Sequence, residues 1–276
     1  MGRATRALIA AALVSLSVIT VAPSSSVDAA TPSTSRCLLR PALQLAPTDP
    51  PSPPAQPNHC TILAIGDSVG LNLGLGLTRE FANQKGVALI SRGVVSTGLV
   101  HDTFYNWPAH LTDYLGRWHP DVVVVCVGAN DHSPIYTNGR SVPLLTLPWQ
   151  AAYQARIRQI ANIVHRFGAQ IVWVGVPISS TGGYRQAMKA MNSIYKGVMA
   201  TVPGGFYIDT WNLFASPTGT VRPTAKVNNR PMQLRSLDLI HYTPVGCDVF
   251  ATYVIRAIAT KYNVVLRPSA PAVITG

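Results

Sequence analysis

From residue 61 onward, short apolar runs alternate with longer segments of helical spacing. The apolar runs predict strands at residues 61–65, 87–91, 121–127, 170–176 and 206–209. The segments between and after them predict helices at residues 107–118, 149–167, 184–200 and 244–262. Alternating strands and helices predict an α/β domain with a parallel sheet covered on both faces. The run Val122 to Val125 lacks polar alternation, which is typical of a central strand buried on both sides.

Three segments need separate interpretation. Residues 71–77 alternate like a strand and are rich in glycine, but they follow a strand directly, so we expect a helix whose small residues let it lie close to the sheet. Residues 133–147 and 216–237 contain no clear periodicity and are predicted to be long loops that shape a substrate site.

The amino-terminal region differs from the rest of the chain. Arg3 and Arg6 precede an apolar run that ends near Ala22, and small residues follow at 27–30. This pattern predicts a secretory signal at residues 1–30 and therefore a secreted or envelope protein, with an uncleaved membrane anchor as the alternative. Residues 31–58 are rich in proline and serine and predict an extended linker or arm. The folded domain is expected at residues 59–276.

Composition and charge restrict the class of partner. The chain has 276 residues, 47% of them hydrophobic, and a formal net charge of +11, which favours anionic partners. The basic residues are scattered, without a lysine and arginine run, so nucleic-acid binding is not predicted.

Four cysteines allow three disulfide pairings. Cys37 and Cys60 flank the proline-rich segment, and their pairing is the leading prediction. Cys126 lies in the most apolar strand and is expected to be a buried thiol, whereas Cys247 is left open. The cysteine and histidine spacing predicts no metal site, and no cofactor is predicted.

Three polar motifs carry candidate chemistry. The first predicted strand ends in Gly66-Asp67-Ser68, which places a hydroxyl at the start of a helix, where free N–H groups favour an oxyanion. The third strand is followed by Asn130, whose amide can face the same oxyanion. Asp238 precedes His241 by three positions, a spacing that lets the carboxylate orient the imidazole. Taken singly, each motif is also an ordinary turn, helix cap or core residue.

Together these motifs resemble the first, third and fifth blocks of the SGNH hydrolases, also called GDSL esterases, over residues 61–262. The resemblance implies a three-layer α/β/α domain with five parallel strands in the flavodoxin-like order 2-1-3-4-5. It also implies that Ser68 is the nucleophile, His241 the general base and acid, and Asp238 the residue that orients His241. Asn130 and the Ser68 N–H would be oxyanion donors.

The second block of the family supplies a further oxyanion N–H from a glycine. Gly98 is the preferred candidate and Gly93 the alternative. The family usually has glycine where this chain has Leu239, which puts activity in question. Asp67 is expected to accept backbone hydrogen bonds and hold the serine turn.

Residues 104–108, 173–177 and 234–235 resemble an exported bacterial subgroup related to the SGNH domains of envelope acyltransferases. The expected function is an exported serine esterase that cleaves acyl esters, acetyl esters above all, on carbohydrates or small molecules. The alternatives are an O-acyltransferase that modifies envelope glycans, with a membrane acyltransferase as partner, and a catalytically silent envelope-binding protein. Trp107 and Trp211 line a sugar groove or belong to the core, and Arg222, Arg230 and Arg235 attract an anionic glycan or are ordinary solvated charges.

Overall fold

The computed structural model describes residues 60–179, 182–266 and 274–275. The predicted signal and proline-rich segments lie outside the described residues, as does Cys37, so the signal peptide and the Cys37–Cys60 disulfide stay predictions. Cys126 and Cys247 are both buried free thiols, which confirms the prediction for Cys126 and answers the open question for Cys247. Burial raises the pKa of the Cys247 thiol to about 11.

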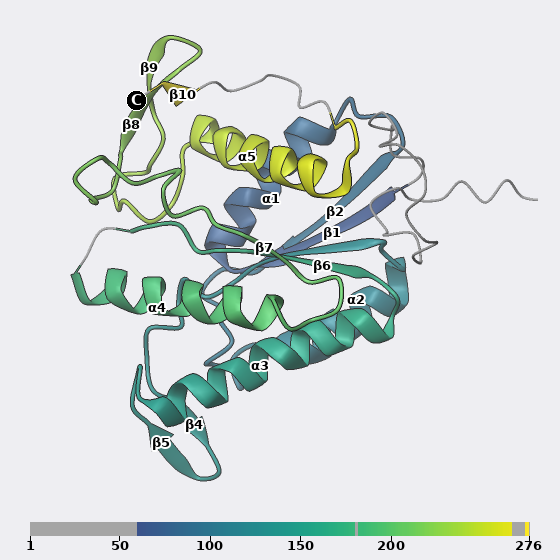
Figure 1. Cartoon of the computed structure of the whole chain (residues 1–276), viewed down its shortest axis with the longest axis vertical. Coiled ribbons are helices and arrows are strands. Elements are labelled where there is room, and N and C mark those ends of the chain that lie inside the picture. The colour runs from purple at the N-terminus through teal and green to yellow at the C-terminus, as the bar shows by residue number, and fades with distance from the viewer. Residues whose placement is uncertain (1–59, 180–181, 267–273, 276) are drawn as a thin grey trace, which may run out of the picture. The chain divides into compact units, whose positions relative to one another are not determined.

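A five-stranded parallel sheet in the order β2-β1-β3-β6-β7 forms the centre of the domain (Figure 1). Counted among the strands of this sheet alone, the order is 2-1-3-4-5, so the predicted fold is confirmed. In such a sheet, the loops at the carboxyl ends of the strands form the binding site. The strands are β1 (Cys60–Gly66), β2 (Val87–Gly93), β3 (Val122–Cys126), β6 (Gln170–Val174) and β7 (Phe206–Ile208).

Among the described residues, five helices cover the two faces of the sheet. Two of them, α1 and α5, pack together on one face, and the other three lie on the opposite face (Figure 1). Two helices have the predicted bounds, and two begin two residues before the predicted position. The helices are α1 (Ser68–Phe81), α2 (Trp107–Trp118), α3 (Leu147–Arg166), α4 (Gly182–Met199) and α5 (Pro244–Tyr262).

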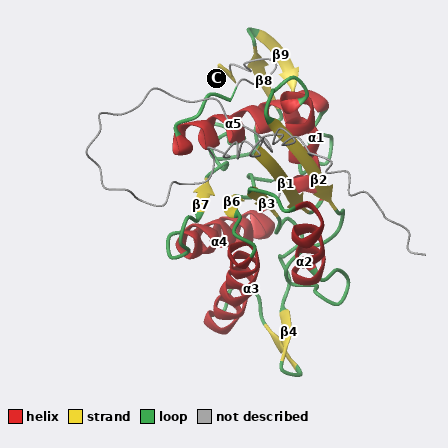
Figure 2. Ribbon diagram, turned by 90° about the vertical axis from the view of Figure 1, so that its right-hand side faces the viewer, coloured by secondary structure: helices red, strands yellow, loops and turns green. Residues whose placement is uncertain are grey.

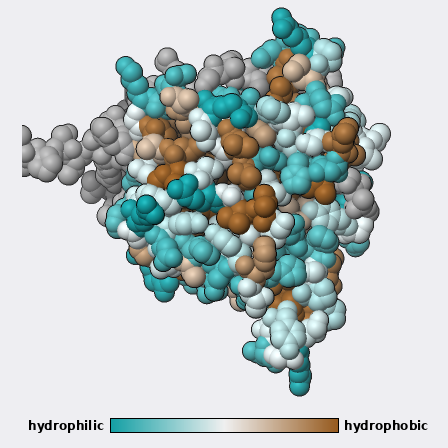
Figure 3. All heavy atoms as spheres, turned by 180° about the vertical axis from the view of Figure 1, so that it is seen from behind, coloured by the Kyte–Doolittle hydropathy of each residue, from teal (hydrophilic) through white to brown (hydrophobic). Residues whose placement is uncertain are grey.

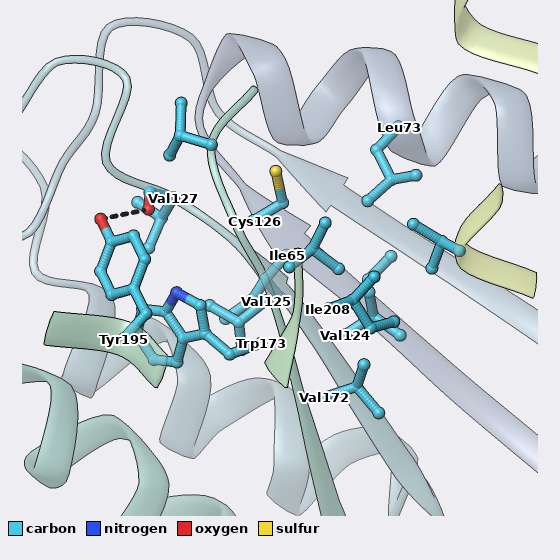
Figure 4. Packing of buried hydrophobic residues seen from close by; sticks show 14 of the residues in the cluster. Ile65, Leu73, Val124, Val125, Cys126, Val127, Val172, Trp173, Tyr195 and Ile208 are labelled. Atoms are coloured by element: carbon cyan, nitrogen blue, oxygen red, sulfur yellow. Dashed lines mark hydrogen bonds between the residues drawn. The ribbon is translucent and has the colours of Figure 1, made fainter. Parts of the chain in front are cut away.

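The central strand β3 is buried at every position, as its unbroken valine run predicts. Its side chains pack against residues of β1, β6 and β7, including Ile65, Val172 and Ile208 (Figure 4). Each fully buried valine contributes roughly 1.5–3 kcal/mol to folding. The core therefore holds rigid the strand that ends beside the candidate site.

Residues 71–77 belong to helix α1, as expected, and two glycines show why. A Cβ atom on Gly74 would lie 2.1 Å from the Ser91 hydroxyl of β2, and one on Gly76 would lie 2.1 Å from the Cys247 carbonyl oxygen of α5. The glycines therefore let α1 lie close to the sheet and to α5 at once.

The predictions of long loops at 133–147 and 216–237 are wrong, because each segment contains a β-hairpin. Strands β4 (Ile135–Thr137) and β5 (Arg140–Val142) pair around the Asn138-Gly139 turn and project away from the sheet (Figures 1 and 2). Strands β8 (Thr224–Val227) and β9 (Arg230–Gln233) form the second hairpin, which β10 (Ile274–Thr275) extends on the β8 side.

On the face drawn in Figure 3, hydrophobic residues form separate patches among hydrophilic ones. Within the described part of the chain, no helix combines the length and the apolar character that a membrane span requires.

Candidate active site

Ser68 is the first residue of α1, directly after β1 ends at Gly66. Asp67 is the N-cap of this helix, and its carboxylate accepts hydrogen bonds from the backbone N–H groups of Val69 and Gly70. The strand-to-helix turn places the Ser68 hydroxyl at the carboxyl edge of the sheet, beside the positive end of the helix dipole. Ser68 is partly exposed, so a substrate can reach it.

The structure brings together Ser68, Asp238 and His241, which lie far apart in the sequence. The Nε2 atom of His241 is 2.8 Å from the Ser68 hydroxyl oxygen, and its Nδ1 atom is 2.6 Å from a carboxylate oxygen of Asp238. The carboxylate can only accept a hydrogen bond, so the proton of the neutral ring lies on Nδ1 and Nε2 is left to accept the Ser68 proton. This is the arrangement of a nucleophile, a general base and an orienting acid.

Asp238 is fixed by the loop that it begins. Its second carboxylate oxygen accepts the backbone N–H groups of Ile240 and His241, both at 2.9 Å. Partial burial raises the pKa of Asp238, but the hydrogen bonds from the His241 ring and from these N–H groups outweigh burial and lower the pKa to about 2. The carboxylate is therefore ionised near neutral pH.

Leu239 lies in the left-handed region of backbone conformation, with φ of 57°. The resemblance to the SGNH family implies glycine at this position. The Leu239 N–H donates to the Ser236 carbonyl, which closes a tight turn between Asp238 and its neighbours. Leucine therefore keeps the turn that glycine favours, at a conformational cost of roughly 1–2 kcal/mol.

Asp67 joins two parts of the site. One carboxylate oxygen caps α1, and the other accepts the backbone N–H groups of Gly128 and Ala129 at 2.8 and 2.7 Å. Burial raises the pKa of Asp67 to about 6, against the lowering effect of these hydrogen bonds. The expectation that Asp67 holds the turn through backbone hydrogen bonds is confirmed.

The Asn130 side chain lies beside the loop that follows β2. Its Nδ2 atom donates to the Thr97 carbonyl at 2.8 Å, which fixes the amide and leaves its second hydrogen for another acceptor. Gly98, the preferred glycine, directly follows Thr97. Gly93 instead ends β2 and packs against Leu71 of α1, where an added Cβ would lie 2.5 Å from the Leu71 Cα.

Asp131 holds this loop from beneath. It is fully buried and accepts the N–H groups of Leu99 and Val100, both at 2.9 Å, and the Tyr153 hydroxyl at 2.7 Å. A Cβ on Gly98 would lie 2.1 Å from an Asp131 carboxylate oxygen, so only glycine fits there. Burial raises the pKa of Asp131, and the three hydrogen bonds oppose that effect.

Arg235 corrects one expectation, because it is neither a solvated charge nor an exposed contact for a glycan. Only 1% of its surface is exposed, and its guanidinium donates to the carbonyl oxygens of Ile240 and Ile178 at 2.7 and 2.5 Å. The guanidinium carbon also lies 4.0 Å from the centre of the Tyr242 ring. Burial lowers the pKa of Arg235.

The two tryptophans singled out in the sequence have different environments. Trp107 is 1% exposed and its indole N–H donates to the Thr97 hydroxyl, so it belongs to the core. Trp211 is half-buried and follows β7 at the carboxyl edge of the sheet. Arg222 is also half-buried, whereas Arg230 is exposed on β9.

Comparison with known proteins places this fold in a family. A family model described as "Protein of unknown function (DUF459)" matches residues 61–257, which is more than half of the chain. The chain belongs to the DUF459 family. No protein in the curated collection matches it.

Solved structures of SGNH hydrolases share the fold of this DUF459 protein, as predicted. A GDSL-like lipase from Bacteroides thetaiotaomicron matches with a TM-score of 0.52 and 14% identity, over 75% of this chain and 92% of the lipase. An acetylxylan esterase from Geobacillus stearothermophilus matches with a TM-score of 0.53 and 16% identity, over 76% of this chain and 98% of the esterase. In that esterase, alanine variants of a serine, an aspartate and a histidine are described as catalytic mutants, and the aspartate precedes the histidine by three positions.

Proposed function

We propose that this protein is a serine esterase that cleaves short acyl esters, acetyl esters above all, on carbohydrates or small molecules. The observation that carries the proposal is the continuous hydrogen-bonded relay from Asp238 through His241 to Ser68. The acetylxylan esterase with the same fold supports it, since its catalytic aspartate and histidine have the spacing of Asp238 and His241.

In the proposed reaction, the Ser68 hydroxyl oxygen attacks the ester carbonyl carbon while His241 Nε2 takes the hydroxyl proton. The negative charge that forms on the carbonyl oxygen is stabilised by hydrogen bonds from the N–H groups of Ser68 and Gly98 and from the Asn130 amide. When the carbon–oxygen bond to the alcohol breaks, His241 gives its proton to the alcohol. A water molecule then attacks the acyl carbon while His241 takes one of its protons, and His241 returns that proton to the Ser68 oxygen as the acyl group leaves as a carboxylic acid.

The preference for Gly98 over Gly93 as a donor rests on the contacts of the loop. Gly98 directly follows Thr97, whose carbonyl holds the Asn130 amide, so both donors belong to one hydrogen-bonded unit. Gly93 is the last residue of β2 and packs directly against Leu71 of α1.

The test is hydrolysis of p-nitrophenyl acetate and butyrate by the parent protein and by Ser68→Ala and His241→Ala. Matched controls are Ser141→Ala and His165→Ala, which change an exposed serine on β5 and an exposed histidine on α3. We expect burst and turnover in the parent and the controls, and a loss of about 10³-fold or more in the two site variants. A parent protein that forms no acyl-enzyme would contradict the proposal and favour an envelope-binding role.

A second measurement separates hydrolysis from transfer, because the same three side chains serve both. The acyl-enzyme is formed in the presence of xylo-oligosaccharide, and the products are analysed by mass spectrometry. Free acid as the main product supports the esterase. Acylated sugar as the main product would instead assign an O-acyltransferase.

A further inference from the structure

A groove lies between helix α4 and the carboxyl end of β7, at the edge of the sheet farthest from β2. Its volume is about 370 Å³. We call it the α4–β7 groove; it is lined by Lys189, Asn192, Ser193, Lys196, Tyr207, Asp209, Trp211 and Asn212. None of these residues takes part in the relay of Ser68, His241 and Asp238.

Two lysines give one wall of the groove its charge. Lys189 and Lys196 are seven residues apart on α4, so they lie on the same side of the helix, roughly 10.5 Å apart along its axis. Both are exposed, and neither ammonium group has an ion-pair partner among the residues that the structure describes. The groove lining therefore holds two lysines without an ion-pair partner in the described part of the chain, and one carboxylate, that of Asp209.

Trp211 and Asn212, in the segment that follows β7, also line the groove. Asp209 accepts the backbone N–H of Trp211 at 2.9 Å, which fixes the turn after β7, and the Trp211 side chain is half-buried. Asn212 is exposed and lines the same groove. An aromatic face next to amide and hydroxyl groups suits a sugar ring, which has both an apolar face and hydroxyl groups.

The floor of the groove is rigid. The Asn192 amide makes two hydrogen bonds to the backbone of Val176, at 2.9 and 2.8 Å, and the Tyr207 ring packs against Gly175. Ligand recognition therefore falls to the rim residues Lys189, Lys196 and Trp211, while the floor sets the depth.

The groove and the candidate active site both lie at the carboxyl ends of the sheet strands. Trp211 follows β7 and Ser68 follows β1, and these strands are separated by β3 and β6. Three strand spacings correspond to roughly 14 Å. A chain of several sugars bound at Trp211 is long enough to reach Ser68, whereas a single sugar is not.

We propose that the α4–β7 groove binds an anionic glycan chain, with Trp211 stacked on one sugar ring and with Lys189 and Lys196 paired to carboxylates of the chain. The net charge of +11 favours the approach of such a polymer. Binding at the groove does not depend on the esterase activity. That the bound chain delivers its ester to Ser68 rests on the proposed function.

The test measures binding of polygalacturonate, with neutral dextran for comparison, by calorimetry at 50 and 200 mM salt. The protein is the Ser68→Ala variant of the full chain, so that catalysis cannot alter the ligand. The groove variants are Lys189→Gln with Lys196→Gln, and Trp211→Ala. The charge-matched control is Lys226→Gln with Arg230→Gln, at two exposed positions of the β8–β9 hairpin.

We expect each groove variant to bind polygalacturonate at least 10-fold more weakly, the control to change by less than about 2-fold, and dextran to bind more weakly than polygalacturonate. Equal losses in the groove and control variants would show that the charge acts diffusely and overturn the proposal. Absence of polygalacturonate binding would overturn it as well.

A second measurement separates this proposal from the proposed function. The groove substitutions are introduced into the protein that keeps Ser68, and hydrolysis of p-nitrophenyl acetate by these variants is measured. We expect parental rates, since the small ester does not need the groove. If the parent protein binds polygalacturonate through the groove but cleaves no ester, the proposal for the groove stands and the proposed esterase function is wrong.

Discussion

The Arg235 guanidinium donates a hydrogen bond of 2.7 Å to the carbonyl oxygen of Ile240, the residue that precedes His241. The same side chain lies against the ring of Tyr242, which follows His241, and donates to Ile178 in the loop after β6. One buried cation thus holds both neighbours of the candidate base and ties them to the sheet.

Replacement of Arg235 by lysine is therefore expected to lower kcat of ester hydrolysis by roughly 10–100-fold with little change in KM, because lysine cannot bond two carbonyls with one planar group. Rates are compared at a temperature where circular dichroism shows both proteins fully folded. Arg256→Lys, at an exposed position of α5, is the control and is expected to keep the parental kcat. If the fully folded Arg235→Lys variant keeps the parental kcat, Arg235 has no positioning role.

Removal of the Asn130 amide tests the oxyanion contribution. For Asn130→Ala we expect kcat to fall by about 10²–10³-fold, since one preformed donor to the developing charge is lost. The matched variant is Asn212→Ala in the groove, which is expected to leave hydrolysis of p-nitrophenyl acetate unchanged. A loss below about 3-fold in Asn130→Ala would mean that the amide serves only to hold Thr97.

The left-handed turn at Leu239 predicts that a glycine variant is more stable than an alanine variant there, the reverse of the usual order in helices. In the left-handed region, a residue with a Cβ atom destabilises the folded state by roughly 1–2 kcal/mol. Glycine avoids this steric cost, and its greater freedom in the unfolded chain lowers stability by only roughly 0.5–1 kcal/mol. We expect Leu239→Gly to be more stable than Leu239→Ala, by up to about 1 kcal/mol, in urea unfolding. The same pair at Leu75, an exposed position within α1, is expected to show the ordinary order, with alanine more stable. If the alanine variant is more stable than the glycine variant at both positions, the backbone at Leu239 is not strained.

Asp238 predicts a pH dependence of stability. Its pKa is about 2 in the folded protein, against about 3.9 in an unfolded chain, so the unfolded state binds more protons between these values. Its stabilising contribution is therefore present above pH 4 and is lost as the pH falls toward 2. We expect the difference in Tm between the parent and Asp238→Asn to be constant from pH 5 to 7 and to shrink below pH 4. A difference that is independent of pH down to 2 would show that the carboxylate charge plays no part.

The parts of the fold that depend on local periodicity could be predicted from the sequence. The buried valine run of β3 and the bounds of α2 and α5 follow from the spacing of apolar residues. The hairpin of β4 and β5 was missed although Asn138-Gly139 between short β-prone segments is a strong hairpin signal. The β8–β9 turn at Asn228 and Asn229, both with positive φ, is a weaker signal of the same kind.

The residues of the candidate site could be selected from motifs, but their supports could not. Nothing local distinguishes Arg235 from Arg222 or Arg230, since its burial depends on Ile178 and Tyr242 in other segments. The same holds for Gly98 and Gly93, which differ through contacts with Asp131 and Leu71. Such contacts arise only when distant strands are placed side by side.

The Asp67 carboxylate caps the helix that begins with Ser68 and also holds the N–H groups of Gly128 and Ala129, next to Asn130. Local opening of either turn breaks hydrogen bonds of the same buried side chain. The amides of Val69, Gly128 and Ala129 are therefore expected to exchange with solvent deuterium in one cooperative event. The serine and the amide beside it would then be assembled, or lost, as a single unit.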